Sequence, residues 1–440
     1  MALDFTRHFR FQRRLARLWF RRIGFWIGAL AVSAAAILFA WTANLAFALF
    51  HRLTAPSPYL AIVIAPLSLM AIVYVTRRFF PGAQGSGIPQ VIVAIRDPTF
   101  AQSGMLSLKV ASGKMVLTLL GLVGGASIGR EGPTVQIGAA VMLALGRSLG
   151  LAGDRLSRAL ALGGGAAGVA AAFNTPLAGV VFAIEELAGS FEHRTSGTVL
   201  TAVIVAGIAS LAVLGDYTYF GHSNAALNLA NGALPVLTCG VVGGLLGGAF
   251  ARLLIAMTRG IPGFAGRFAG THPLLFALIC GLAIAAIGIF SNGTTYGTGY
   301  DETRALFAGQ APALGGWGLL KLAATLVSYA SGVPGGIFSP SLAAGAGIGA
   351  EIALWLPHAP LGAVILLGMT AYFSGVVQAP ITAVVIVLEM TDNQSMTLPL
   401  MAAAFIAFSI SRLVCRKALY RALADSFMRR QAAPIAQPGR

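Results

Sequence analysis

The stretch GREGPTVQIG, residues 129–138, places the carboxylate of Glu131 among glycines and close to a proline, in a chain where only 10% of the residues are charged. Proline is favoured in the first turn of a helix, where its missing N–H would have had no partner anyway. The same spacing of glycine, proline and glycine recurs in GIFSPSLAAG, residues 336–345. Both stretches therefore predict helix starts, and the acid in the first one calls for a functional explanation.

Long charge-free segments define the class of the protein. Hydrophobic residues make up 57% of the 440 residues, and about 20 apolar residues suffice for a helix to span a bilayer. Glycines and prolines interrupt these segments, which membrane helices tolerate better than soluble ones. The sequence therefore predicts an all-α polytopic membrane protein. The segments without Asp, Glu, Lys or Arg are 24–50, 159–184, 217–251, 268–300, 322–350 and 352–388.

Two sequence patterns occur twice in the same order. Pro133 and Pro340 of the glycine and proline pattern lie 207 residues apart. A second pattern, with proline, two valines and glutamate at fixed spacing, occurs at 176–185 and again at 380–389, 204 residues later. Transporters are often built from two related halves with the binding site between them. We expect such an internal duplication, and chance matching in a chain rich in small apolar residues is the alternative.

Three glycine-rich stretches share one design: GSGIPQ (85–90), GREGPT (129–134) and GGIFSP (335–340) each lead through a proline into an apolar segment. Non-helical backbone at membrane depth is tolerated only where protein buries it or where it lines a cavity. The N–H groups of a helix start carry partial positive charge, and glycines let a ligand approach closely. Three converging helix starts would bind an anion and still release it, whereas ordinary helix kinks are the alternative.

In this order and at these distances, the three stretches resemble the signature motifs of the CLC family of chloride channels and chloride/proton antiporters. The stretch FNTPLAGVVFAIEE (173–186) extends the resemblance over nearly the whole chain. The resemblance implies a CLC fold with two inverted-topology halves of tilted and broken helices, and a homodimer with one anion pathway per subunit. It also implies a set of chloride ligands: the hydroxyls of Ser86 and Tyr420, the backbone N–H groups of Ile337 and Phe338, and the helix start at Gly129 and Arg130.

Glu131 is the acid that this anion site explains. Beside helix-start amides its carboxylate can take the place of chloride, and protonation makes it neutral so that it can swing away. The resemblance assigns to this glutamate the roles of gate and outer proton carrier. The alternative, a simple ion pair with Arg130, is disfavoured because burying such a pair is costly.

Proton movement needs a second acid toward the cytoplasm. Glu185 and Glu186 lie together at the end of a charge-free run, and the family pattern places the inner proton acceptor at Glu186. We therefore expect secondary active chloride/proton antiport, with a passive voltage-gated or pH-gated chloride channel as the alternative. Both glutamates could instead mark the membrane boundary. One of them is also expected to pair with Lys114.

Positive charge gathers at both ends of the chain, with seven arginines in the first 22 residues and seven Lys or Arg from Arg412 onward. Both termini are therefore expected in the cytoplasm, below a bacterial inner membrane. A basic amphipathic helix on the anionic leaflet is favoured over a nucleic-acid-binding arm. The expected organisation is a basic amphipathic helix (1–23), a first membrane half (24–216), a linker (217–233), a second membrane half (234–420) and a short cytoplasmic tail (421–440).

A rival function comes from GGGAAG (163–168), which matches the dinucleotide-binding pattern G-x-G-x-x-G, with Glu185 at the distance of a ribose-binding acid. The stretch lies in a charge-free run with no strand before it, so close helix packing is favoured over a membrane nucleotide-dependent enzyme. The three cysteines and six histidines show no disulfide or metal-ligand spacing. We expect no enzyme, no cofactor, no metal and no nucleic-acid partner, and we expect chloride, protons and the lipid bilayer as the partners.

A few positions refine the resemblance. Many relatives carry Glu after GSGIP where this chain has Gln90, followed by Val91 and Ile92, so the inner proton route and the surroundings of Lys114 can differ. Serine at position 86 favours chloride over nitrate, and the absence of methionine there argues against the fluoride-exporting branch. The chain ends soon after Tyr420, without the paired cytoplasmic domains of eukaryotic members, which favours a bacterial transporter.

Overall fold

The protein is seen in a computed structural model, which describes residues 2–97, 99–100, 104–150, 153–189, 196–215, 219–221, 223–227, 229–259, 264–310 and 315–432. In this part of the chain the regular structure is helical, and two isolated β-bridges stand in place of strands. Among the described residues, six helices are long and apolar enough to cross a membrane by length and composition. The prediction of an all-α polytopic membrane protein is confirmed.

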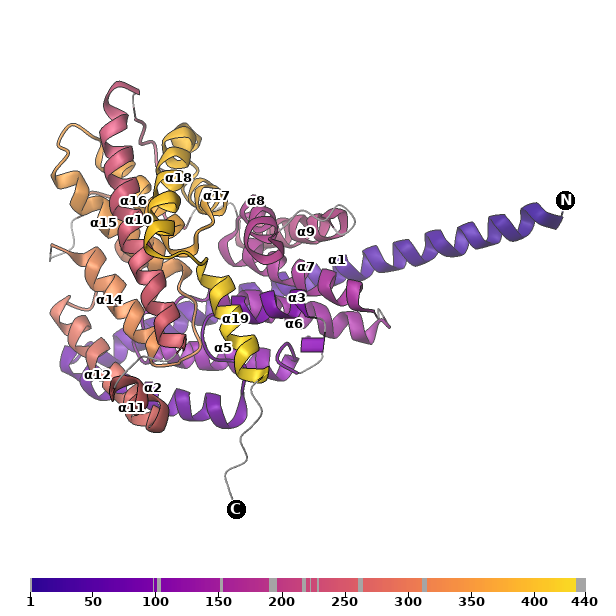
Figure 1. Ribbon diagram of the computed structural model, residues 1–440, viewed down its shortest axis with the longest axis horizontal. Coiled ribbons are helices and arrows are strands. Elements are labelled where there is room, and N and C mark those ends of the chain that lie inside the picture. Colours follow the sequence, from indigo (N-terminus) through magenta and orange to yellow (C-terminus); the bar gives the residue numbers. More distant parts are fainter. Residues whose placement is uncertain are drawn as a thin grey trace, which may run out of the picture.

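The first half of the chain, indigo to magenta in Figure 1, supplies the helices from α1 to α9. They are α1 (Ala2–Thr54), α2 (Ala61–Phe79), α3 (Ile88–Arg96), α5 (Leu108–Val123), α6 (Glu131–Ser148), α7 (Asp154–Phe173), α8 (Pro176–Phe182) and α9 (Ser196–Leu214), with a 3-10 turn at Pro58–Leu60 and a π-helical turn at Ala183–Ala188.

The second half, pink to yellow in Figure 1, supplies the helices from α10 to α19. They are α10 (Leu229–Arg259), α11 (Phe264–Thr271), α12 (Pro273–Phe290), α13 (Tyr300–Phe307), α14 (Trp317–Ala330), α15 (Phe338–Leu354), α16 (Leu361–Val377), α17 (Pro380–Thr391), α18 (Thr397–Val414) and α19 (Leu419–Ala432), with a 3-10 turn at Gln394–Met396.

Helix boundaries differ from the expected organisation at three places. Helix α1 contains no proline and runs without a break from the basic N-terminal residues into the first apolar span, so residue 23 is not a helix boundary. Its N-terminal end projects from the body in Figure 1. Helix α10 begins at Leu229, inside the segment expected as a linker, and α19 continues past Tyr420 as far as Ala432, inside the segment expected as a tail.

The internal duplication appears in how helices cross. A Cβ at Gly164 of α7 would collide with the carbonyl oxygen of Gly138 on α6, and a Cβ at Gly368 of α16 would meet the carbonyl oxygen of Gly345 on α15. Gly345 follows Gly138 by 207 residues and Gly368 follows Gly164 by 204, the same offsets as the two sequence patterns. Each half therefore uses a pair of glycines to bring two buried helices into backbone contact.

The two halves also cap each other. The carboxylate of Glu185 accepts hydrogen bonds from the backbone N–H groups of Ile381 (3.2 Å) and Thr382 (2.7 Å) at the start of α17. In return, Glu389 of α17 accepts from the N–H groups of Leu177 (3.1 Å) and Ala178 (2.6 Å) at the start of α8. The N-terminal N–H groups of a helix lack intrahelical partners and attract negative charge. The reciprocal caps are the contact expected of two halves related by a pseudo-twofold axis.

The glycine pattern at 163–168 lies in the middle of α7, with no strand before it among the described residues. A Cβ at Gly168 would fall 2.6 Å from the carbonyl oxygen of Thr134 on α6, so these glycines serve helix packing. The GxxxG steps of α10 likewise contact α18 of the same chain, since Cβ atoms at Gly240 and Gly244 would collide with Ile406 and Ala407.

Candidate functional site

The three glycine-rich stretches meet at one place. Gly129 and Gly336 exchange two backbone hydrogen bonds of 2.7 Å each, and the N–H of Gly335 donates to the carbonyl oxygen of Gly85 at 3.1 Å. A Cβ at Gly132 would collide with the adjacent loops, so only glycine fits there. The helix starts of α3, α6 and α15 therefore converge, as the sequence predicted.

The first amides of α15 are available to a ligand. Across the described residues, the N–H groups of Ile337 and Phe338 have no hydrogen-bond acceptor. The first N–H groups of a helix have no partner within the helix and carry partial positive charge. These two amides thus remain predicted chloride ligands. Gly129 differs, because its N–H donates to Gly336 and is not offered to an anion in this conformation.

Two buried hydroxyls lie near each other without a partner. Ser86, just before α3, is 1% exposed, and Tyr420, in the first turn of α19, is fully buried. The two hydroxyls lie close enough to interact with each other, but by bond geometry neither has a hydrogen-bond partner in the part of the chain that the structure describes. A buried unpaired hydroxyl costs about 1–3 kcal/mol. An anion that accepted from both hydroxyls would remove that cost, so the pair fits the chloride site predicted from the sequence.

Aromatic rings fix the position of Tyr420. The ring of Phe338 stacks on it, with centroids 5.9 Å apart and planes 17° from parallel. Phe373 packs on Phe338 at 4.7 Å, and Phe173 and Phe182 each lie 5.8 Å from it. The first residue of α15 thus offers its amide on one side and locks a tyrosine with its ring on another.

Glu131 is the first residue of α6 and is 1% exposed. Its Oε1 atom accepts a hydrogen bond of 2.5 Å from the hydroxyl of Tyr300, which is also 2.8 Å from the Oγ atom of Ser339. Its Oε2 atom has no hydrogen-bond partner among the described residues. The carboxylate therefore lies at the junction of α6, α13 and α15, where the helix starts converge.

Arg130 is directed mainly away from this carboxylate. Its guanidinium donates to the carbonyl oxygen of Ala40 (2.7 Å), to Asn44 Oδ1 (3.1 Å) and to the hydroxyl of Tyr219 (2.8 Å). The Nε atom lies 3.9 Å from Glu131 Oε1, at the outer limit of an ion pair. The guanidinium thus ties α6 to α1 and does not reach the hydroxyls of the predicted chloride site.

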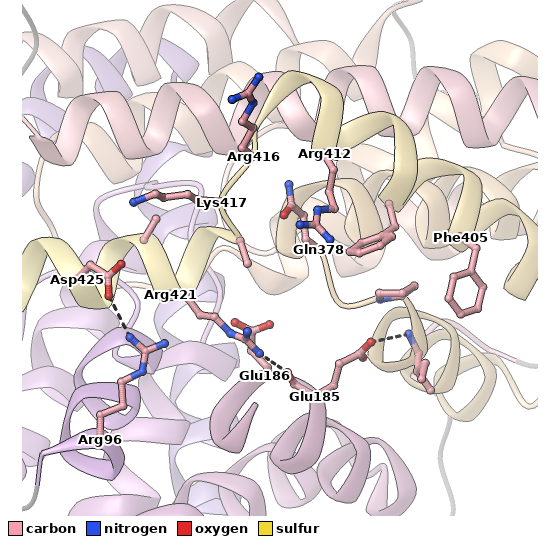
Figure 2. A pocket seen from close by; sticks show the side chains of 15 residues that line it. Arg96, Glu185, Glu186, Gln378, Phe405, Arg412, Arg416, Lys417, Arg421 and Asp425 are labelled. Atoms are coloured by element: carbon pink, nitrogen blue, oxygen red, sulfur yellow. Dashed lines mark hydrogen bonds and ion pairs between the residues drawn. The ribbon is translucent and has the colours of Figure 1, made fainter. Parts of the chain in front are cut away.

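The adjacent glutamates in the π-helical turn differ in their contacts. Glu185 caps α17, whereas Glu186 is 3% exposed and its Oε1 atom has no hydrogen-bond partner within the described residues. Both line a cavity of about 620 Å³, where Arg421 donates to the carbonyl oxygen of Glu185 at 3.1 Å (Figure 2). Single π-helical turns are frequent at functional sites. Glu186 is thus a buried acid at the wall of a wide cavity.

The predicted partner of Lys114 was wrong. Its ammonium donates to the carbonyl oxygens of Ala83 (2.9 Å) and Gly85 (2.8 Å), and neither Glu185 nor Glu186 is its partner. Gln90, the departure from the family pattern, donates to other carbonyls of the same loop at 3.1 and 2.9 Å. Because loop carbonyls need donors at membrane depth, these polar side chains hold the loop that presents Ser86.

Two residues of this region were missed by sequence reasoning. Tyr300 contacts Glu131 directly, and fully buried Lys321 of α14 donates to the carbonyl oxygens of Thr295, Tyr296 and Gly297 at 2.8–3.1 Å. A signal for Lys321 was available, because it follows Lys114 by 207 residues, the offset of the duplicated prolines.

The match of the chain to a known family agrees with this geometry. Residues 67–412 match the model of the voltage gated chloride channel family. The chain belongs to this family. Membership in this CLC family makes the protein a membrane transport protein and not an enzyme, in agreement with the packing role of the glycines in α7.

Solved CLC structures have the same fold. An X-ray structure of a slow cyanobacterial Cl⁻/H⁺ antiporter is similar with a TM-score of 0.78 and 23% identity, over 94% of this chain and 99% of that one. A CLC-type fluoride/proton antiporter gives 0.76 and 25%, over 92% and 98%. A eukaryotic CLC transporter gives 0.76 and 18%, over 94% and 75%.

Proposed function

We propose that the protein exchanges chloride for protons across a bacterial inner membrane, with Glu131 as gate and outer proton carrier and Glu186 as inner proton acceptor. The observation that carries the proposal is the arrangement of two buried acids around the unpaired hydroxyl of Tyr420. This hydroxyl lies close enough to Glu131 and to Glu186 to interact with both charges. The antiporter neighbours add support from the fold.

Chloride would bind where the orphan donors gather. Ser86 and Tyr420 offer hydroxyls, and Ile337 and Phe338 offer amides at the start of α15. Such donors stabilise an anion without a full positive charge, so the ion can also leave. While Glu131 is ionised, its carboxylate stands at the convergence of the helix starts and excludes a second anion. Protonation removes the charge and lets the side chain leave.

Protons would reach the same region from the cavity beside Glu186. A buried acid inside a membrane protein is costly, so it is a candidate for a functional role. The Oε1 atom of Glu186 has no hydrogen-bond partner among the described residues and is free to accept a proton. Glu185 is already engaged as a helix cap, which favours Glu186 for this role. A proton would pass between Glu186 and Glu131 in the direction opposite to chloride.

The basic residues of the cavity wall support an orientation of the protein in the membrane. This wall carries a set of basic side chains from α3, α18, α19 and the segment between α18 and α19: Arg96, Arg412, Arg416, Lys417 and Arg421. Since basic residues favour the cytoplasmic side, we place this cavity and both termini there.

We also propose a homodimer that buries the exposed apolar residues of α8, α9, α17 and α18, which include Leu177, Ile208, Ile381 and Leu398.

Proton uptake by protein in liposomes, under an imposed chloride gradient with the voltage clamped, tests the proposed exchange. We expect the native protein to drive protons uphill, and Glu131→Ala and Glu186→Ala to pass chloride without protons. Glu185→Gln is the matched control, since it changes the neighbouring acid and should keep coupling. If the native protein carries chloride while protons stay at their passive distribution, the protein is a channel and Glu131 can serve only as a gate.

A further inference from the structure

A short chain of hydrogen bonds from the second half of the molecule ends at the carboxylate of Glu131. Tyr300 has one hydroxyl hydrogen, and it lies in the 2.5 Å bond to Glu131 Oε1. In the 2.8 Å contact between Tyr300 and Ser339, the serine must therefore be the donor. Donation from serine to tyrosine to carboxylate polarises each bond in the same direction, which strengthens the last one.

The loop before Tyr300 is fixed in place. Lys321 donates to three of its carbonyl oxygens, and Trp317 Nε1 donates to the carbonyl oxygen of Thr294 at 3.2 Å. Gly299, directly before Tyr300, has φ +85°, a conformation that L side chains rarely adopt. Burying a lysine completely costs free energy, which hydrogen bonds to the loop carbonyls offset only in part. A loop fixed at this cost indicates that the position of Tyr300 matters for function.

The tyrosine ring is also held from its sides. The rings of Tyr219 and Phe220 lie 5.1 and 5.5 Å from it, and the guanidinium carbon of Arg130 lies 5.8 Å from its centroid. A tyrosine clamped on its ring and on its backbone can move its hydroxyl only slightly. The donor is therefore preorganised, whereas Glu131 has a flexible side chain.

We propose that Tyr300 is the hydrogen-bond donor of the outer anion position: it holds the Glu131 carboxylate while the pathway is closed and binds chloride there after the protonated side chain has left. This inference rests on the proposed function, because it assumes that Glu131 is the gate. A donor to a carboxylate stabilises its charged form. Without the hydroxyl, the charged carboxylate loses this donor, so the pathway should open at higher pH.

Other charges around Glu131 leave this hydroxyl a distinct effect. Arg130 is at 3.9 Å and is held by other partners, and Lys114 is bound to loop carbonyls. The acids and bases of α7 lie near its start, and Glu351 lies near the end of α15. These ends of the two helices are the ones far from Glu131. Among the described residues, Tyr219 interacts electrostatically with Tyr300, and Tyr420 interacts with Glu131. Lys321 is bound to the loop carbonyls, and Glu302 interacts with Lys321.

The pH dependence of exchange in liposomes tests the proposal with Tyr300→Phe, which removes one oxygen. We expect the midpoint for activation by external acid to move up by about one pH unit, the size of a lost hydrogen bond to a charged group. Tyr296→Phe is the matched control, because this buried hydroxyl donates to Ala285 and not to Glu131, and its profile should match the native one. Ser339→Ala should move the midpoint the same way by less.

Chloride binding supplies the second readout. In a Glu131→Gln background, adding Tyr300→Phe should weaken chloride binding, measured by calorimetry, about tenfold. An unchanged pH profile in both Tyr300→Phe and Ser339→Ala would overturn the proposal, and unchanged chloride affinity would overturn its anion-binding half. If Glu131→Gln itself keeps the native pH dependence, the proposed function fails instead, since Glu131 is then not the gate.

Discussion

Each half of the molecule holds a glycine-rich loop in front of a short helix by means of one fully buried lysine. In the first half, Lys114 of α5 binds the carbonyls before α3, and the loop presents Ser86. In the second half, Lys321 of α14 binds the carbonyls before α13, and the loop presents Tyr300. The loop scaffold was duplicated, but the residue that it presents differs: Ser86 precedes the N-cap glycine of α3, whereas Tyr300 follows the N-cap glycine of α13.

The difference separates two tasks. Ser86 is short and its hydroxyl has no protein partner in the described structure, so its site is free for a transported ion. Tyr300 is long enough to reach the start of α6, and its hydroxyl is already bound to Glu131. A duplicated fold can therefore keep one loop open for chloride and use the other loop to hold the gate.

The largest expected effect on stability comes from replacing the two buried lysines. Lys321→Met leaves three buried carbonyls without a donor, whereas Lys114→Met leaves only that of Ala83, because the carbonyl oxygen of Gly85 still accepts from the N–H of Gly335. Each unsatisfied group costs about 1–3 kcal/mol. We expect both variants to lose thermal stability in detergent, Lys321→Met more than Lys114→Met. Equal losses would show that the two loops do not depend on their lysines in proportion to these bonds.

The glycine crossings give the next largest effect. Gly164→Ala and Gly368→Ala each force a Cβ against a backbone carbonyl of the partner helix, and such overpacking costs about 1–3 kcal/mol. We expect similar drops in melting temperature, with Gly270→Ala as the control, since nothing lies within 4 Å of a Cβ there. A large drop in only one of the two crossing variants would mean that the halves pack by different rules.

Removing the hydroxyl of Ser86 tests whether the two loops have separate tasks. Ser86→Ala removes an unpaired donor, so the fold should keep its stability while chloride affinity falls about tenfold, equal to about 1.4 kcal/mol. Calorimetric titration with chloride measures this, and the pH midpoint of exchange should stay near the native value. A pH shift as large as that of Tyr300→Phe would contradict the division of tasks.

The reciprocal helix caps give the smallest effect. Glu185→Gln and Glu389→Gln each weaken the charge at a helix start, which is worth about 0.3–1 kcal/mol. We expect small and equal losses of thermal stability and unchanged coupling of chloride to protons. Loss of coupling in Glu185→Gln would give this residue the role proposed for Glu186.

Much of this arrangement followed from local patterns. The glycines and prolines at 85–90, 129–134 and 335–340 identified the helix starts that converge, because those residue types act through the backbone in any context. The partners of Lys114 could not be predicted in this way, because acids are the usual expectation for a lysine and its real acceptors are loop carbonyls. The link from Tyr300 to Glu131 joins residues 169 positions apart, which no local pattern encodes.

The sequence by itself determined the class of this protein, the duplication and the three helix starts, since apolar length, repeat spacing and the chemistry of glycine and proline are local properties. Tertiary structure alone decided which polar groups meet. Glu185 became a cap and Glu186 remained unpaired, although they are neighbours, because the two halves pack with α17 against one of them. Burial makes each unpaired polar group costly, so the contacts between distant segments decide which groups stay free for ions.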